Sequence, residues 1–115
     1  MANNIKAVLV QPGKAATIVA CSTELRELQK IVGGYIEVAH LLEDEDAVII
    51  CNEEGKLMGL PPCRTIRDEH GNRLDIICGS FLIVYAAPDD DDFSSLPEDM
   101  LKKYLRLFEQ PEVFI

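Results

Sequence analysis

The hydrophobic pattern opens with two short β-type runs. Residues 5–10 are apolar and rich in β-branched side chains, residues 16–21 repeat this character, and Pro12-Gly13 lies between the two runs. A Pro-Gly pair is a strong turn signal, and two such runs joined by a turn are typical of a β-hairpin. We therefore expect an antiparallel hairpin at the start of the chain.

Two later segments have the periodicity of amphipathic helices. In residues 24–32 the apolar side chains recur every three or four positions, and Gly33 follows as a stop signal. The second helical segment follows Ser95, which with Glu98 fits a capping box, and Pro111 ends it. Both helices have one apolar and one charged face, so we expect them to pack on a sheet, both on the same face of it.

Further β-type segments fill the middle of the chain. The run 47–51 is uninterrupted and apolar, as expected of a strand buried on both faces, and 81–85 is expected to be the central strand. Residues 56–60 form a possible hairpin partner for the strand before them. The other expected strands are 35–41, 65–67 and 73–78. Because βαβ alternation is absent, the pattern predicts an α+β fold with a mixed, mainly antiparallel sheet and two amphipathic helices.

Length and composition limit the protein class. With 115 residues and 48% apolar residues, the chain suits a single α+β domain over residues 1–115. No apolar run approaches the roughly 20 residues of a membrane span, and the N-terminus lacks a signal-peptide pattern. These observations predict a cytoplasmic protein without membrane association.

The charge argues against nucleic-acid binding. The formal net charge is −9, with 11 basic residues scattered among 20 acidic ones, whereas a phosphate backbone is bound by clustered Lys and Arg. Solubility is the simple explanation of the acidity. An acidic DNA mimic or protein inhibitor of a host enzyme is the alternative, although a mimic needs carboxylates spread over a surface, whereas residues 89–92 form one dense acidic run.

Four cysteines occur without a Cys-x-x-Cys pair, which predicts reduced, partly buried thiols and no metal site. The common nucleotide-binding and metalloprotease motifs are also absent, so no cofactor is expected.

The strongest candidate for a functional surface is the loop 51–64. It concentrates Gly, Pro, Cys and charged residues, a composition typical of a shaped loop with fixed backbone angles. Its backbone donors and cations could hold a small anionic ligand or the acidic edge of a protein partner. The expected ligand-binding residues are Asn52, Lys56, Arg64, Arg67 and Asp75. A purely structural role for the loop remains an equal alternative.

A small hydrolase is the enzymatic alternative. Cys63 would be its nucleophile, because the neighbouring Arg64 could lower the pKa of the thiol. Its base would be His70 or His40, but no local signature ties either to the cysteine. We therefore assign no catalytic residue and expect a protein that acts by binding.

Several motifs together resemble the domain of unknown function family 3846. They run through Val32–Glu37, Cys51–Lys56, Gly59–Pro62 with Arg64, Asp75–Ile77 with Gly79 and Phe81, and Phe93–Leu96. Cys63 departs from the family pattern, which usually has Asn there. The family comprises small proteins of phages, mobile elements and mainly Gram-positive bacteria. The resemblance therefore implies an accessory protein of phage or mobile-element type, but no activity.

The apolar tail 112–115 and the acidic connector also make a homodimer plausible.

Overall fold

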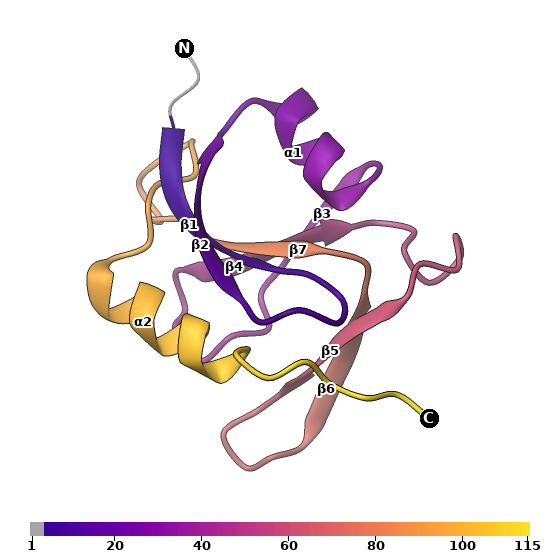
Figure 1. Cartoon of the computed structure of the whole chain (residues 1–115). Helices are drawn as coiled ribbons and strands as arrows, with labels where there is room; N and C mark the ends of the chain where they lie inside the picture. The colour runs from indigo at the N-terminus through magenta and orange to yellow at the C-terminus, as the bar shows by residue number, and fades with distance from the viewer. Residues whose placement is uncertain (1–3) are drawn as a thin grey trace.

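The computed structural model describes residues 4–115, and within this range it contains seven strands and two helices. The strands are β1 (Asn4–Val10), β2 (Thr17–Ser22), β3 (Ile36–Ala39), β4 (Ala47–Asn52), β5 (Pro62–Arg67), β6 (Arg73–Cys78) and β7 (Phe81–Tyr85), and the helices are α1 (Leu25–Val32) and α2 (Glu98–Leu107) (Figure 1). All pairs between these strands are antiparallel. The predicted α+β class, with an antiparallel sheet and two helices, is confirmed.

Five strands form the main sheet, in the order β2-β1-β7-β4-β3. The β1–β2 hairpin has the predicted position, and Lys14 N donates to Gln11 O at 3.2 Å within its turn. β7 is the central strand, as predicted. Every residue of β4 is buried, because both faces of this strand are covered.

The two helices cover opposite faces of this sheet, so the expectation that both lie on one face was wrong. Leu28 and Val32 of α1 pack against one face, whereas Leu101, Tyr104 and Phe108 at α2 pack against the other. In Figure 1, α1 lies above the sheet and α2 below it. The physical reason is that the central strands are apolar on both faces, and each face needs a cover to exclude water.

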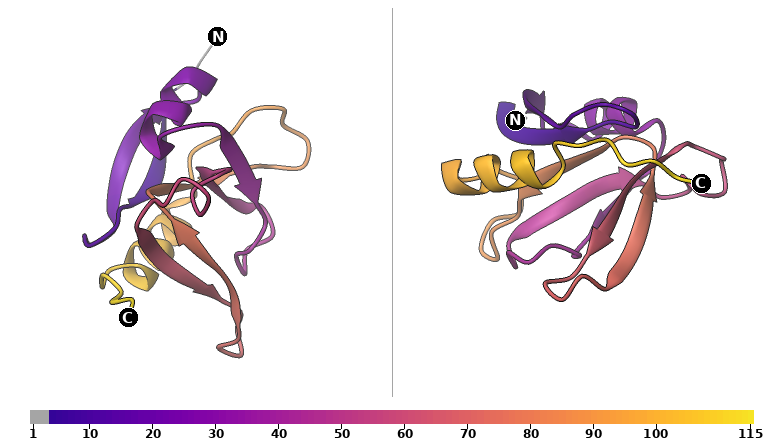
Figure 2. Two further views of the ribbon diagram at one scale, coloured as in Figure 1. Left: turned by 90° about the vertical axis from the view of Figure 1, so that its right-hand side faces the viewer. Right: turned by 60° about the horizontal axis from the view of Figure 1, so that its bottom comes forward.

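β5 and β6 form a separate hairpin that contributes to the same core as α2. The hairpin predicted around residues 68–72 is confirmed and extends further, from Pro62 to Cys78. Asp68 orders its turn, since one carboxylate oxygen accepts hydrogen bonds from the backbone N–H groups of His70 and Asn72. The two views in Figure 2 show this hairpin projecting from the main sheet, with the chain after α2 running toward it.

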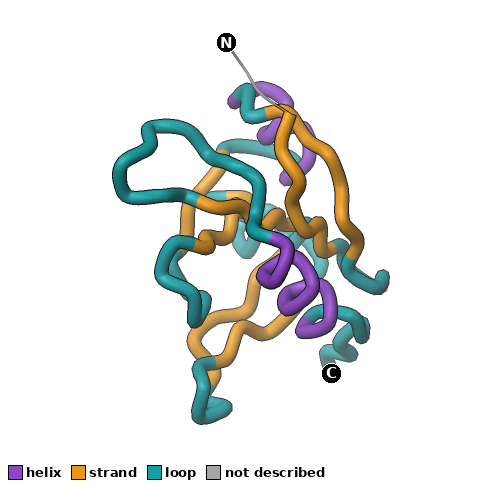
Figure 3. The backbone as a smooth tube through the Cα atoms, turned by 90° about the vertical axis from the view of Figure 1, so that its left-hand side faces the viewer, coloured by secondary structure: helices purple, strands orange, loops and turns teal. Residues whose placement is uncertain are grey.

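The start of α2 differs from the prediction. Pro97 occupies the N-cap position and no side chain caps the helix. Ser95 Oγ instead accepts a hydrogen bond from Lys6 N at 2.8 Å, so this hydroxyl fixes the connector to β1 and is not available as a cap. Figure 3 shows the connector as a long loop that leaves the sheet and returns to enter α2. In the described part of the chain, no helix is long and apolar enough to cross a membrane.

Candidate binding groove

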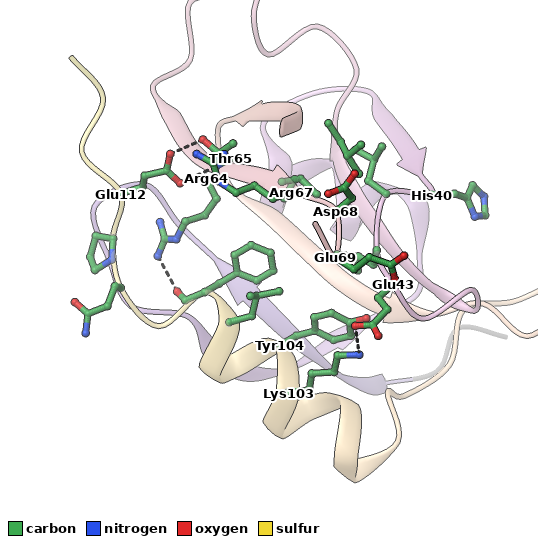
Figure 4. A pocket seen from close by; sticks show the side chains of 18 residues that line it. His40, Glu43, Arg64, Thr65, Arg67, Asp68, Glu69, Lys103, Tyr104 and Glu112 are labelled. Atoms are coloured by element: carbon green, nitrogen blue, oxygen red, sulfur yellow. Dashed lines mark hydrogen bonds and ion pairs between the residues drawn. The ribbon is translucent and has the colours of Figure 1, made fainter. Parts of the chain in front are cut away.

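A cavity of about 710 Å³ lies between β5 and α2. Its lining comes from residues 40–43, from β5 and the turn after it, from the last turns of α2, and from residues 110–112, with Leu74 of β6 at one side. We call this cavity the β5–α2 groove (Figure 4). It exists because the β5–β6 hairpin stands apart from the main sheet and leaves space beside the end of α2.

Arg64 forms the inner wall of the groove and is only 2% exposed. Its Nη2 donates to Lys14 O at 2.5 Å and to Phe108 O at 2.9 Å, and its Nη1 donates to Cys63 O at 2.9 Å. One guanidinium therefore ties the β1–β2 turn, the end of α2 and β5 together. Its Nε is buried and has no hydrogen-bond partner within residues 4–115.

Glu112, in the tail after α2, closes one side of the groove. Its carboxylate accepts a 2.9 Å hydrogen bond from Thr65 N and another from the Thr65 hydroxyl. Partial burial raises the pKa of Glu112, but the two hydrogen bonds from Thr65 and the charges of Arg67 and Arg64 outweigh this effect and hold the pKa below its usual range. The site on β5 thus favours a negatively charged carboxylate.

The opposite side of the groove is held by a polar cluster at α2. Tyr104 Oη donates to Asp44 Oδ2 at 2.6 Å, and Lys103 Nζ lies 3.0 Å from both Asp44 Oδ2 and Glu43 Oε2. The hydrogen bond from Tyr104, followed by the one from Lys103, holds the pKa of Asp44 below its usual range. These contacts fix the β3–β4 connection against the helix, and they pair the charge of Lys103 with two carboxylates.

Two of the five predicted ligand-binding residues, Arg64 and Arg67, line the groove. Arg67 is exposed, and its Nη1 donates to Gly71 O at 3.2 Å. The three others, Asn52, Lys56 and Asp75, are not part of the lining. The five residues therefore do not share one cavity.

Asn52 is buried, and its side chain is used by hydrogen bonds within the fold. It is 6% exposed, its Nδ2 donates to Val32 O at 3.1 Å, and its Oδ1 accepts from Glu54 N at 2.7 Å. Lys56 and Asp75 form an exposed ion pair of 2.5 Å. Residues 56–59 form turns and residue 60 belongs to no strand, so the possible hairpin partner predicted there is absent.

The prediction did not include Thr65, Glu112 or Leu107, which all line the groove. Their positions depend on contacts between β5 and a tail 47 residues later in the chain. The only sequence signal for them was the tail after Pro111, which is unusually apolar.

The cysteine environments do not favour thiol chemistry. Cys63 is fully buried, and burial raises the pKa of its thiol to about 11, although the charge of Arg64 acts in the other direction. The candidate bases His40 and His70 are both exposed, and Figure 4 shows His40 pointing away from the groove. All four cysteines are free. From Asn4 to the C-terminus, no group of three or more His, Cys, Asp or Glu side chains could hold a metal ion.

Comparison with known families identifies the chain. The model of the family described as "Domain of unknown function (DUF3846)" matches residues 5–109, and the chain therefore belongs to this family. The match includes β5 and α2 but ends before Glu112. No curated protein and no solved structure matches the chain.

Proposed function

We propose that the protein acts by binding, and that the β5–α2 groove receives an extended segment of a partner protein. The single observation that carries this proposal is the groove itself, because its volume of about 710 Å³ lies in the range of roughly 300–1,000 Å³ that is typical of ligand sites. A phage or mobile-element origin, a cytoplasmic location and a homodimer stay predictions.

Apolar side chains at the groove support a protein partner. Leu74 of β6 is 47% exposed and Leu107 of α2 is 61% exposed, and both line the groove. Exposed leucines on two sides of one cavity offer apolar area that a partner side chain can bury. Phe108 and Ile66, which are almost fully buried, complete the apolar surface below them.

The edge of β5 supports an extended conformation of the bound segment. β5 pairs only with β6 in the described structure, and the N–H of Thr65 points away from β6 toward the tail. A strand with a free edge can add another extended segment through main-chain hydrogen bonds, while neighbouring pockets select its side chains. A groove between a strand edge and a helix offers both features.

A small anionic ligand is the second candidate, because the cations Arg64 and Arg67 both line the groove and Arg64 Nε has no partner among the described residues. The other guanidinium donors of Arg64 are already used by backbone carbonyl groups. This favours the protein partner, since a tightly held anion normally needs several free donors.

A matched pair of leucine variants tests the proposal. Leu107→Asp places a charge in the groove, whereas Leu57→Asp makes the same change at a leucine that is 87% exposed and outside the groove lining. In affinity capture from the source organism, wild type and Leu57→Asp are expected to retain the same partner, and Leu107→Asp to lose it. Capture of identical proteins by all three, or of none, contradicts the proposal.

Calorimetry tests the second candidate. Wild type and Arg67→Ala are titrated with a panel of nucleotides, which are anionic and partly apolar. Heat with wild type that Arg67→Ala abolishes supports a small anionic ligand, and absence of heat with every nucleotide removes nucleotide capture.

A further inference from the structure

The contact between Thr65 and Glu112 has the features of a carboxylate-binding site. A backbone N–H and a hydroxyl group of one residue both donate to the same carboxylate. Arg67 and Arg64 lie close enough for their charges to lower the pKa of that carboxylate. Two donors combined with nearby guanidinium groups bind a carboxylate more strongly than neutral donors alone.

The same region contains a donor that the tail does not satisfy. Arg64 Nε is buried, and the structure offers it no partner anywhere in residues 4–115. Because buried donors in proteins are nearly always paired, this donor marks Arg64 as a guanidinium whose hydrogen-bonding capacity is not fully used. Arg64 and Thr65 both line the groove, which places the guanidinium-bearing residue next to the carboxylate site on the same strand.

The tail itself is held through few hydrogen bonds. Among the described residues, Glu112 provides the hydrogen bonds between residues 111–115 and the rest of the chain, and no backbone group of this segment takes part. Val113 and Ile115 are exposed, whereas Glu112 and Phe114 are partly buried. This alternation is the pattern of an extended segment with one side toward the protein.

We infer that Thr65, Arg64 and Arg67 form a carboxylate site that the chain fills with its own Glu112, and that an extended acidic segment of a partner protein competes for it. The inference rests on the proposed function and specifies the chemistry of the partner. The partner segment has a Glu or Asp followed by apolar residues, because the segment now seated at β5 has this chemistry. The partner carboxylate takes the two hydrogen bonds that Thr65 now donates to Glu112.

The test uses the full-length chain and a fluorescent peptide with the sequence of residues 109–115. Glu112→Gln weakens the internal competitor, and Glu109→Gln is the matched control at an exposed glutamate outside the groove lining. Anisotropy titrations are expected to show about tenfold tighter binding to Glu112→Gln than to wild type or Glu109→Gln, as the loss of one charge-assisted contact implies. Changing the second glutamate of the peptide to Gln is expected to weaken binding by a similar factor.

Equal affinity for the three proteins, or equal binding of the two peptides, overturns the inference. Light scattering of the wild type provides an additional test. A wild-type dimer that Glu112→Gln dissociates would show that tails are exchanged between two copies, and it would overturn the assignment of the site to another protein. The peptide assay contains only the purified chain and the peptide. A negative result in this assay can therefore be distinguished from a negative result in the Leu107→Asp capture experiment.

Discussion

Arg64 is expected to contribute strongly to the stability of this fold. Arg64→Ala removes three hydrogen bonds of 2.9 Å or less, which end on carbonyl groups of Lys14, Phe108 and Cys63. Hydrogen bonds from a charged group contribute roughly 1.5–3 kcal/mol each, but folding also removes the guanidinium from water. We therefore expect a net loss of about 3–5 kcal/mol, a large fraction of the roughly 5–15 kcal/mol by which a domain is stable.

Urea unfolding followed by circular dichroism measures this loss. With an m-value of about 1.5 kcal/mol/M, the midpoint should fall by about 2–3 M. Arg67→Ala is the matched control, because Arg67 is an exposed arginine on the same strand, and its effect should stay within about 0.5 kcal/mol. Arg64→Lys keeps the charge but not the fork of donors, so an intermediate loss is expected. A loss below about 1 kcal/mol for Arg64→Ala, or one equal to that of Arg67→Ala, would refute the reasoning.

Three further predictions concern other parts of the fold. A Cβ at Gly55 would lie 2.6 Å from the backbone oxygen of Cys78, so Gly55→Ala should destabilise the chain by about 2 kcal/mol in urea unfolding, because backbone must move. Tyr104→Phe removes the hydrogen bond that most lowers the pKa of Asp44. When folding lowers the pKa of a carboxylate, the folded chain is stabilised at pH values above the usual pKa of Asp. This stabilisation is lost as the pH falls through the pKa that the carboxylate has in the folded chain. The melting temperatures of wild type and Tyr104→Phe should therefore differ at pH 7 and converge in acid. Cys63, fully buried with a raised pKa, should resist iodoacetamide at pH 8 until urea unfolds the chain, as mass spectrometry can show.

The sequence predicted those parts of the fold that depend on local pattern. The β1–β2 hairpin follows from two β-branched runs and a Pro-Gly turn, and the end of α1 follows from Gly33, which adopts φ 82°. The placement of β7 at the centre of the sheet follows from its continuous apolar run. The capping box failed because Ser95 serves a residue 89 positions away, and no local rule includes that partner.

The candidate site was predicted less well, for a similar reason. Arg64 was identified as a cation in a shaped loop, which suggested an exposed donor. Its burial results from carbonyl groups of Lys14 and Phe108, 50 and 44 residues away, which converge on it in the folded chain. Thr65 was missed because its importance depends on the tail residue Glu112. Long-range partners decide the role of each of these residues.

The two sides of the β5–α2 groove differ in how firmly they are held. Arg64 connects three separate segments through short hydrogen bonds, and Tyr104 and Lys103 attach the β3–β4 connection to α2. The tail, by contrast, is fixed through the single carboxylate of Glu112. A site whose walls stay in place when its internal occupant leaves needs little reorganisation to accept another segment, and this lowers the cost of binding. The arrangement therefore separates Arg64, which maintains the groove, from Glu112, which we infer controls access to it.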